Sequence, residues 1–194
     1  MLKHRNLVFF LLPVAAWTLM LLTFWPGLLS YDSMFQWGYA DQANFSDWHP
    51  VFHTFLIWLF SRIANTPAAP LFAQILSFSL VIYAILSYFQ SLKVPWVLLL
   101  AICAVFILFP LNSLFVITLW KDIPFSLAVL MLSFCMLKIV ITRGQFLEEW
   151  KNVGFLVIVA VCVILLRHNG YPIALLSMLV TGFVYRRYLR MILI

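Results

Sequence analysis

Charged residues are scarce in this sequence. They make up 9% of its 194 residues, whereas about a quarter of an average soluble domain is charged. Apolar residues make up 65%, an excess that a sphere of this size cannot bury. This composition excludes a soluble enzyme, a nucleic-acid-binding domain and a disordered chain, so lipid must surround most of the protein. The net charge of +6 then reflects orientation, because Lys and Arg collect on the cytoplasmic side of a membrane.

Cysteine is also rare. Cys103, Cys135 and Cys162 lie in apolar runs, without CxxC spacing and without a histidine nearby in the sequence. We expect them to be small buried hydrophobic residues rather than metal ligands or disulfide partners. Internal repeats and low-complexity tracts are absent as well, and repeats are what many transporter folds are built from.

Long apolar runs are what the sequence has instead. About 20 apolar residues are needed to cross a bilayer core about 30 Å thick. The first run follows Lys3 and Arg5, is longer than a signal peptide's apolar region, and has no A-x-A site after it, which predicts a retained signal anchor. The whole pattern predicts an all-α, polytopic membrane bundle in a single domain, 1–194. Its expected spans, about six, are 7–25, 71–90, 94–112, 123–141, 153–166 and 171–185.

Two segments leave alternatives. Asn169-Gly170 is a turn signal between the last two runs, so these form either a hairpin of two short helices, which we favour, or one broken helix. Segment 51–63 has about 13 residues and contains His53 and Arg62, which predicts an interfacial helix rather than a span. We therefore expect the long loop 26–70 to carry interfacial helices at the outer surface.

The distribution of basic residues tests this topology. With a cytoplasmic N-terminus and 51–63 left at the surface, only Arg62, Lys121 and Arg167 fall outside. The inner residues are Lys3, Arg5, Lys93, Lys138, Arg143, Lys151, Arg186, Arg187 and Arg190. If 51–63 crossed instead, most of these cations would lie outside, so the positive-inside rule favours the first arrangement and a multi-pass protein of the cell membrane.

In that arrangement the unusual polar residues share the outer face. Asp32 in the first loop is either a helix-capping residue or a general base. Asp47 and His49, two residues apart before Pro50, could bind a divalent cation but are too few to make a metal site alone.

Two later outer turns carry the remaining polar candidates. Lys121 and Asp122 open a helix, where they either cap it and pair locally or hold a phosphate and a hydroxyl. Arg167, followed by His168 and Asn169, either snorkels to the interface or pairs with a lipid phosphate.

The order of these features resembles the GT-C superfamily of membrane glycosyltransferases. The likeness is to its protein O-mannosyltransferase and aminoarabinose-transferase branch, and to related bacterial proteins. The matching pieces are Pro26-Gly27 with Tyr31-Asp32-Ser33 and Gln36, then Ser46-Asp47-Trp48-His49-Pro50-Val51, then Lys121-Asp122-Ile123-Pro124, and more loosely Arg167-His168-Asn169-Gly170. Because members of that superfamily normally continue into further helices, the resemblance implies the N-terminal part of a longer module, active or inactive.

The resemblance also implies a reaction. Such enzymes transfer a sugar from a polyprenyl-phosphate donor to a hydroxyl on the outer face of the membrane. Asp32 would be the general base, and Lys121 and Arg167 would hold the leaving phosphate. Asp47, His49, Asp122, His168 and Asn169 would bind substrate, with a divalent metal ion as an open option. The expected partners are membrane lipid, the lipid-linked sugar and a further polypeptide that completes the module, and no nucleic acid. A transporter or flippase, and a non-catalytic assembly subunit, are the competing classes.

Overall fold

The structure, a computed structural model, describes residues 5–46 and 48–188. In these ranges the regular secondary structure is helical throughout, and the β-type pairing is limited to an isolated bridge between Leu28 and Thr118. The all-α prediction is therefore confirmed. The chain divides into two compact units, which are described separately. The first holds the residues up to His49 together with Thr54–Ile123, and the second holds Pro50–His53 and the residues from Pro124 onward.

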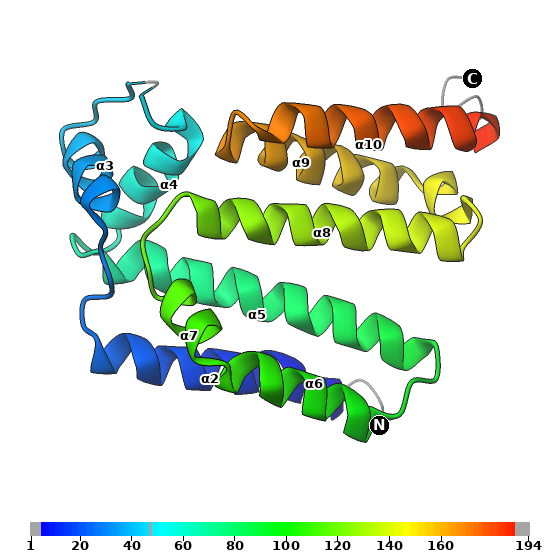
Figure 1. Cartoon of the computed structure of the whole chain (residues 1–194), viewed down its shortest axis with the longest axis horizontal. Helices are drawn as coiled ribbons and strands as arrows, with labels where there is room; N and C mark the ends of the chain where they lie inside the picture. Colours follow the sequence, from blue (N-terminus) through cyan, green and yellow to red (C-terminus); the bar gives the residue numbers. More distant parts are fainter. Residues whose placement is uncertain (1–4, 47, 189–194) are drawn as a thin grey trace. The chain divides into compact units, whose positions relative to one another are not determined.

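Three long helices of the first unit pack side by side: α2 (Val8–Thr23), α5 (Ala68–Ser91) and α6 (Trp96–Leu108) (Figure 1). Gly27, just after α2, lies against Leu71 at the start of α5, so these two helices are antiparallel. The rings of Phe9 and Trp96, at the starts of α2 and α6, have centroids 6.0 Å apart. The end of α2 and the start of α5 therefore lie at one end of the unit, and Trp96 lies at the other.

Trp17 of α2 forms the centre of the core between these helices. Its side chain is fully buried, and its ring meets Phe78 of α5 and Phe106 of α6 edge-on, at centroid distances of 6.2 Å. Buried edge-to-face aromatic pairs add about 0.5–1.5 kcal/mol each beyond the area that they bury. Cys103 is buried in α6 and is free, as the sequence predicted.

The expected span 94–112 is not one straight helix. α6 ends at Leu108, and α7 (Pro110–Val116) follows after a bend of 68°. Pro110 explains the break, because proline has no N–H to donate and keeps the preceding residue out of the helical region. Phe109 accordingly has a ψ of 115°. The Ser113 hydroxyl donates to the Ile107 carbonyl at 2.6 Å and satisfies one of the groups that the break leaves without a helical partner.

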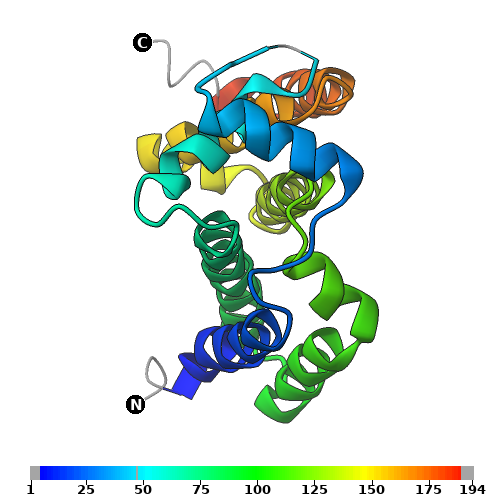
Figure 2. The same cartoon turned by 90° about the vertical axis from the view of Figure 1, so that its left-hand side faces the viewer.

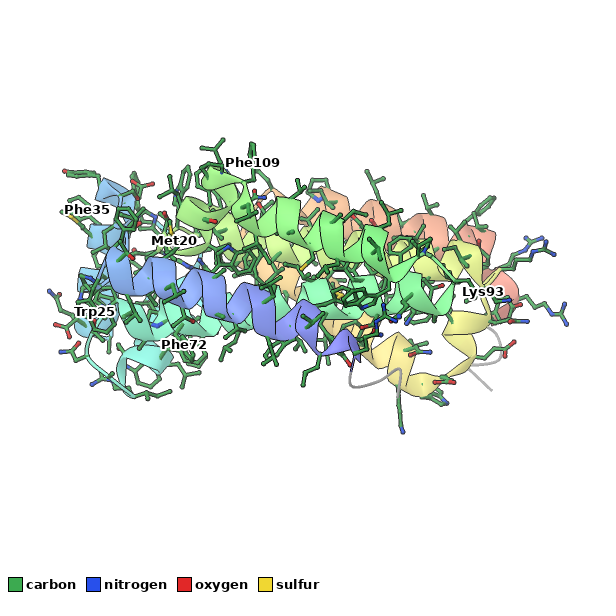
Figure 3. The ribbon with its side chains drawn as sticks, turned by 90° about the horizontal axis from the view of Figure 1, so that it is seen from below. Met20, Trp25, Phe35, Phe72, Lys93 and Phe109 are labelled. Atoms are coloured by element: carbon green, nitrogen blue, oxygen red, sulfur yellow. The ribbon has the colours of Figure 1, made fainter. Side chains whose placement is uncertain are left out.

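The predicted interfacial segment 26–70 forms two short helices, α3 (Tyr31–Asp41) and α4 (Val51–Ser61). In Figure 2, α2 and α5 are seen nearly end-on, whereas α3 runs across the view. The Gln36 amide on α3 donates a buried hydrogen bond of 3.1 Å to the Thr54 hydroxyl on α4. Figure 3 shows Trp25 and Phe35 at this end of the first unit and Lys93, in the α5–α6 turn, at the opposite end.

The second unit is built from α8 (Asp122–Ile141), the 3-10 turn η1 (Gln145–Glu148), α9 (Trp150–Leu166) and α10 (Gly170–Val184). Their apolar faces enclose a core that includes Cys135, Ile139, Leu147, Val163 and Ala174. Gly170 touches the carbonyl of Val163, so a Cβ would not fit where α10 turns back on α9. Because α9 and α10 pack against each other, the last two apolar runs form the hairpin that Asn169-Gly170 predicted.

By length and composition, α5 and α8 can each cross a membrane, and α6 with α7 makes a third candidate if the bent pair is one span. The apolar helices α2, α4, α9 and α10 are shorter, with 10–17 residues. The structure therefore supports a helical protein with two or three candidate membrane spans.

Gly27 offers a direct test of the packing between α2 and α5. Its φ of +113° is unfavourable for other residues, and a Cβ there would overlap Leu71 and lie 3.2 Å from the Ile117 carbonyl oxygen. We expect Gly27→Ala to lower the free energy of unfolding by at least about 1 kcal/mol, measured by denaturant titration in detergent. Gly38 in α3 is the matched control, because a Cβ there meets no described residue within 4 Å. Gly38→Ala should raise stability by about 0.5–1 kcal/mol, and equal effects of the two changes would contradict the assignment.

Candidate functional site

The loop after α2 is joined to the loop after α7 by backbone hydrogen bonds. The Leu28 N–H donates to the Ile117 carbonyl and the Leu119 N–H donates to the Leu28 carbonyl, both at 2.9 Å. Gln74, from the second turn of α5, donates through its amide to the carbonyls of Val116 and Thr118, at 2.8 and 3.2 Å. These bonds tie three elements together at the end of the first unit where α2 stops.

Asp32 stands in the first turn of α3, where the Ser30 hydroxyl caps the helix. Ser30 and Ser33 form a reciprocal capping box, in which each side chain accepts from the backbone N–H of the other at 3.2 Å. The position of Asp32 is electrostatically favourable, because the N-terminus of a helix carries partial positive charge. Its side chain is 53% exposed, so the carboxylate can be reached from outside the protein.

Lys121 connects Asp32 to His49. The Nζ atom of Lys121 lies 3.5 Å from Oδ2 of Asp32 and 3.2 Å from Nδ1 of His49. A lysine ammonium only donates, so Nδ1 of His49 must be the accepting, unprotonated nitrogen of the ring. The Tyr39 ring flanks the imidazole, with a centroid distance of 6.4 Å. A carboxylate, an ammonium and an imidazole therefore meet although His49 and Lys121 are 72 positions apart in the chain.

The surroundings keep His49 neutral. Burial is the largest cause that lowers its pKa below the ordinary value of 6.5, and the positive charge of Lys121 lowers it further, while Asp32 opposes both. His49 is 5% exposed. The neutral ring can accept a hydrogen bond from Lys121 through Nδ1 and still donate one through Nε2. At neutral pH His49 therefore orients the Lys121 ammonium and does not act as an acid.

The structure thus brings together three of the residues that the sequence singled out: Asp32, His49 and Lys121. Asp122, the next residue along the chain, begins α8 and is half-buried. Asp47 lies outside the described residues. In the ranges that the structure describes, no group of three or more His, Cys, Asp and Glu residues could hold a metal ion. Since Nδ1 of His49 faces Lys121, its ring has one nitrogen left for any metal.

The other predicted residues belong to the second unit. Arg167 has an extended backbone between α9 and α10, and its guanidinium lies 5.9 Å from the centroid of the Phe125 ring. His168 and Asn169 are exposed in the same turn. His53, predicted to be buried or interfacial, is buried.

The residues that position the site were not among the candidate site residues of the sequence, although Gln36 is one of the pieces that carry the resemblance. Gln74 is an amide in an otherwise apolar stretch, and Gln36 lies one helical turn after Asp32 and Ser33. A polar side chain in an apolar run is a usable signal, because such a group needs a partner when it is buried. The residues next to Gln74 or Gln36 in the sequence do not show which group that partner is.

Comparison with protein-family models, curated proteins and solved structures found no match to this chain.

The neutral state of His49 predicts a pH dependence of stability. Because its pKa is lowered on folding, the unfolded chain binds more protons in the interval below pH 6.5. The stabilisation is complete above that value and is lost as the pH falls through it toward the lower pKa of the folded state. We expect the melting temperature, followed by circular dichroism in detergent, to fall less steeply with pH in His49→Gln than in the natural protein. The exposed His168 is the control: His168→Gln should keep the natural slope, and a natural slope in His49→Gln would contradict the assignment.

Gln74 gives a second prediction. Gln74→Met keeps the side-chain volume but removes the donor shared by the carbonyls of Val116 and Thr118. Leaving a buried carbonyl without a donor costs about 1–3 kcal/mol, so we expect a loss of unfolding free energy in that range. Gln90 on the same helix is half-buried, and its Oε1 has no hydrogen-bond partner among the residues that the structure describes. Gln90→Met should therefore change stability little, and a similar loss in both variants would show that Gln74 is not special.

Proposed function

We propose that this chain is an integral membrane glycosyltransferase, or part of one, that moves a sugar from a polyprenyl-phosphate donor to an acceptor hydroxyl at the membrane surface. The observation that carries the proposal is the meeting of Asp32, Lys121 and His49 at one end of an apolar helical unit. A lipid-linked donor has its tail in lipid and its phosphate at the interface, so a site for it must combine apolar walls with a cation at their end.

In the proposed reaction Asp32 is the general base. The acceptor oxygen attacks the anomeric carbon, and its proton passes to the Asp32 carboxylate. The bond between that carbon and the phosphate oxygen breaks, and its electron pair leaves with the polyprenyl phosphate. A positioned base of this kind contributes about 10²–10⁴-fold to the rate. The exposure of Asp32 supports this role, because an acceptor can approach the carboxylate from outside.

Lys121 is the proposed phosphate ligand. Its ammonium has three N–H donors, of which one faces His49 and one faces Asp32. The third can meet a phosphate oxygen and stabilise the negative charge that grows on the leaving group. The neutral ring of His49 orients the ammonium without competing for the phosphate. In this proposal Asp122, the next residue along the chain, contacts the sugar or the acceptor, and a further polypeptide completes the module.

The proposed placement in the membrane has α2, α5, α6 with α7, α8, α9 and α10 as six spans, a cytoplasmic N-terminus and the Asp32 end outside. The alternating directions of α2, α5 and α6 support it. α2 has 16 residues, about 24 Å of helix at about 1.5 Å per residue. The bilayer core is about 30 Å thick, and a shorter helix is accommodated by local thinning and by flanking aromatic residues such as Phe24 and Trp25.

The test of the proposal is transfer by Asp32→Asn. Membranes from cells that express the chain supply the acceptor, and polyprenyl phosphates carrying labelled mannose, glucose or aminoarabinose supply the sugar. We expect chain-dependent release of free polyprenyl phosphate with at least one donor, and a loss of about 10²-fold or more in Asp32→Asn. Asp41→Asn is the matched control, because Asp41 is an exposed carboxylate at the other end of α3. Unchanged release by a folded Asp32→Asn protein would remove Asp32 as the base.

Lys121→Met separates binding from chemistry. Polyprenyl monophosphate without a sugar should raise the melting temperature of the natural protein and of Asp32→Asn, but not that of Lys121→Met. Stabilisation of Lys121→Met to the natural extent would assign the phosphate to a different cation.

A further inference from the structure

The second unit gathers the ends of three helices at one place. Gly144, in the turn after α8, has a φ of +90° and packs so closely on Tyr185 and Tyr188 that a Cβ would lie 2.5–2.8 Å from their rings. Asn152 in the first turn of α9 donates to the Phe146 carbonyl of η1 at 3.0 Å. The end of α8, the turn η1, the start of α9 and the end of α10 therefore lie together (Figure 1).

This end of the second unit carries more basic than acidic residues. Arg143, Lys151, Arg186 and Arg187 are all exposed there, and we call these four residues the basic end. The ammonium of Lys138, one turn before the end of α8, lies over the Phe146 ring at 4.5 Å from its centroid. Glu148 and Glu149 are nearby in the chain, yet among residues 5–46 and 48–188 no cation of the basic end forms an ion pair. Its positive charge is thus left available for an external anion.

The surface beside the basic end is apolar and aromatic. Trp150, which begins α9, is 66% exposed, and Phe183, in the last turn of α10, is 80% exposed. Farther along the same helices, Ile158 and Leu176 are also exposed. Exposed aliphatic side chains that give way to tryptophan and then to arginine and lysine match the order of a bilayer, from acyl chains through the interface to phosphate groups. A nucleic acid or an acidic protein would match the cations but not the apolar surface that borders them.

We propose that the basic end binds the phosphate groups of anionic phospholipids and holds this end of the second unit at one leaflet. Each lysine or arginine close to an anionic surface strengthens binding by about 1 kcal/mol, or about fivefold. Arginine also presents a planar fork that can bind a phosphate through two hydrogen bonds. The basic end belongs to the second unit, whereas Asp32, Lys121 and His49 belong to the first, and the proposal does not depend on the proposed transferase activity.

The test is the preference of the full chain for anionic lipid. The protein is reconstituted into phosphatidylcholine vesicles that contain either brominated phosphatidylcholine or brominated phosphatidylglycerol, and quenching of tryptophan fluorescence gives the relative association constant of the two lipids. We expect the natural protein to favour phosphatidylglycerol by about threefold or more, and the preference to weaken as salt screens the charges. The variant Arg143→Gln, Lys151→Gln, Arg186→Gln, Arg187→Gln should lose most of it.

Two controls make the result decisive. Arg62→Gln with Lys93→Gln removes exposed cations from the first unit and should leave the preference unchanged. Replacing the three arginines of the basic end by lysine keeps the charge and should keep most of the preference, with a fold like that of the natural protein by circular dichroism. Equal association constants for the two lipids in the natural protein, or an unchanged preference in the fourfold variant, would overturn the proposal.

Discussion

The pairing of Leu28 with the backbone around Thr118 is the contact on which the candidate site depends. Two backbone hydrogen bonds of 2.9 Å join the segment after α2 to the segment after α7. Asp32 follows four residues after Leu28, and Lys121 follows three residues after Thr118, so the pairing sets both residues at one end of the unit. Gly27 allows the approach because it has no Cβ to meet Leu71.

Gln74 explains how this pairing is held in apolar surroundings. Carbonyl groups in an irregular segment are costly to bury unless they receive a donor, and backbone that is neither helix nor sheet has few donors to offer. The amide of Gln74 supplies two such bonds from the side of α5. A single polar residue on a long apolar helix therefore fixes the path of a loop, and through that loop the position of Lys121.

The chemistry of the site follows from burial as much as from residue type. Lys121 lies between a carboxylate that is open to the outside and an imidazole that is not. Burial and the nearby ammonium lower the pKa of His49, and the neutral ring accepts from Lys121, a contact that the sequence had not suggested for this residue. The pattern Asp47-Trp48-His49 could not reveal this, because the residue that faces His49 is 72 positions away.

The sequence by itself determined the helical class, the apolar runs, the turn at Asn169-Gly170 and the short helices between 26 and 70. The signals for these features are hydrophobic periodicity, proline, glycine and capping residues, and each of them acts over a few positions in the chain. The sequence also contained the signal for the bend, Pro110, but the predicted span 94–112 took no account of that proline. Tertiary structure alone decided that Asp32, His49 and Lys121 meet and that the basic end is left without carboxylate partners among the described residues. Both depend on which helix ends lie together, and that arrangement is set by packing and by hydrogen bonds between residues far apart in the chain.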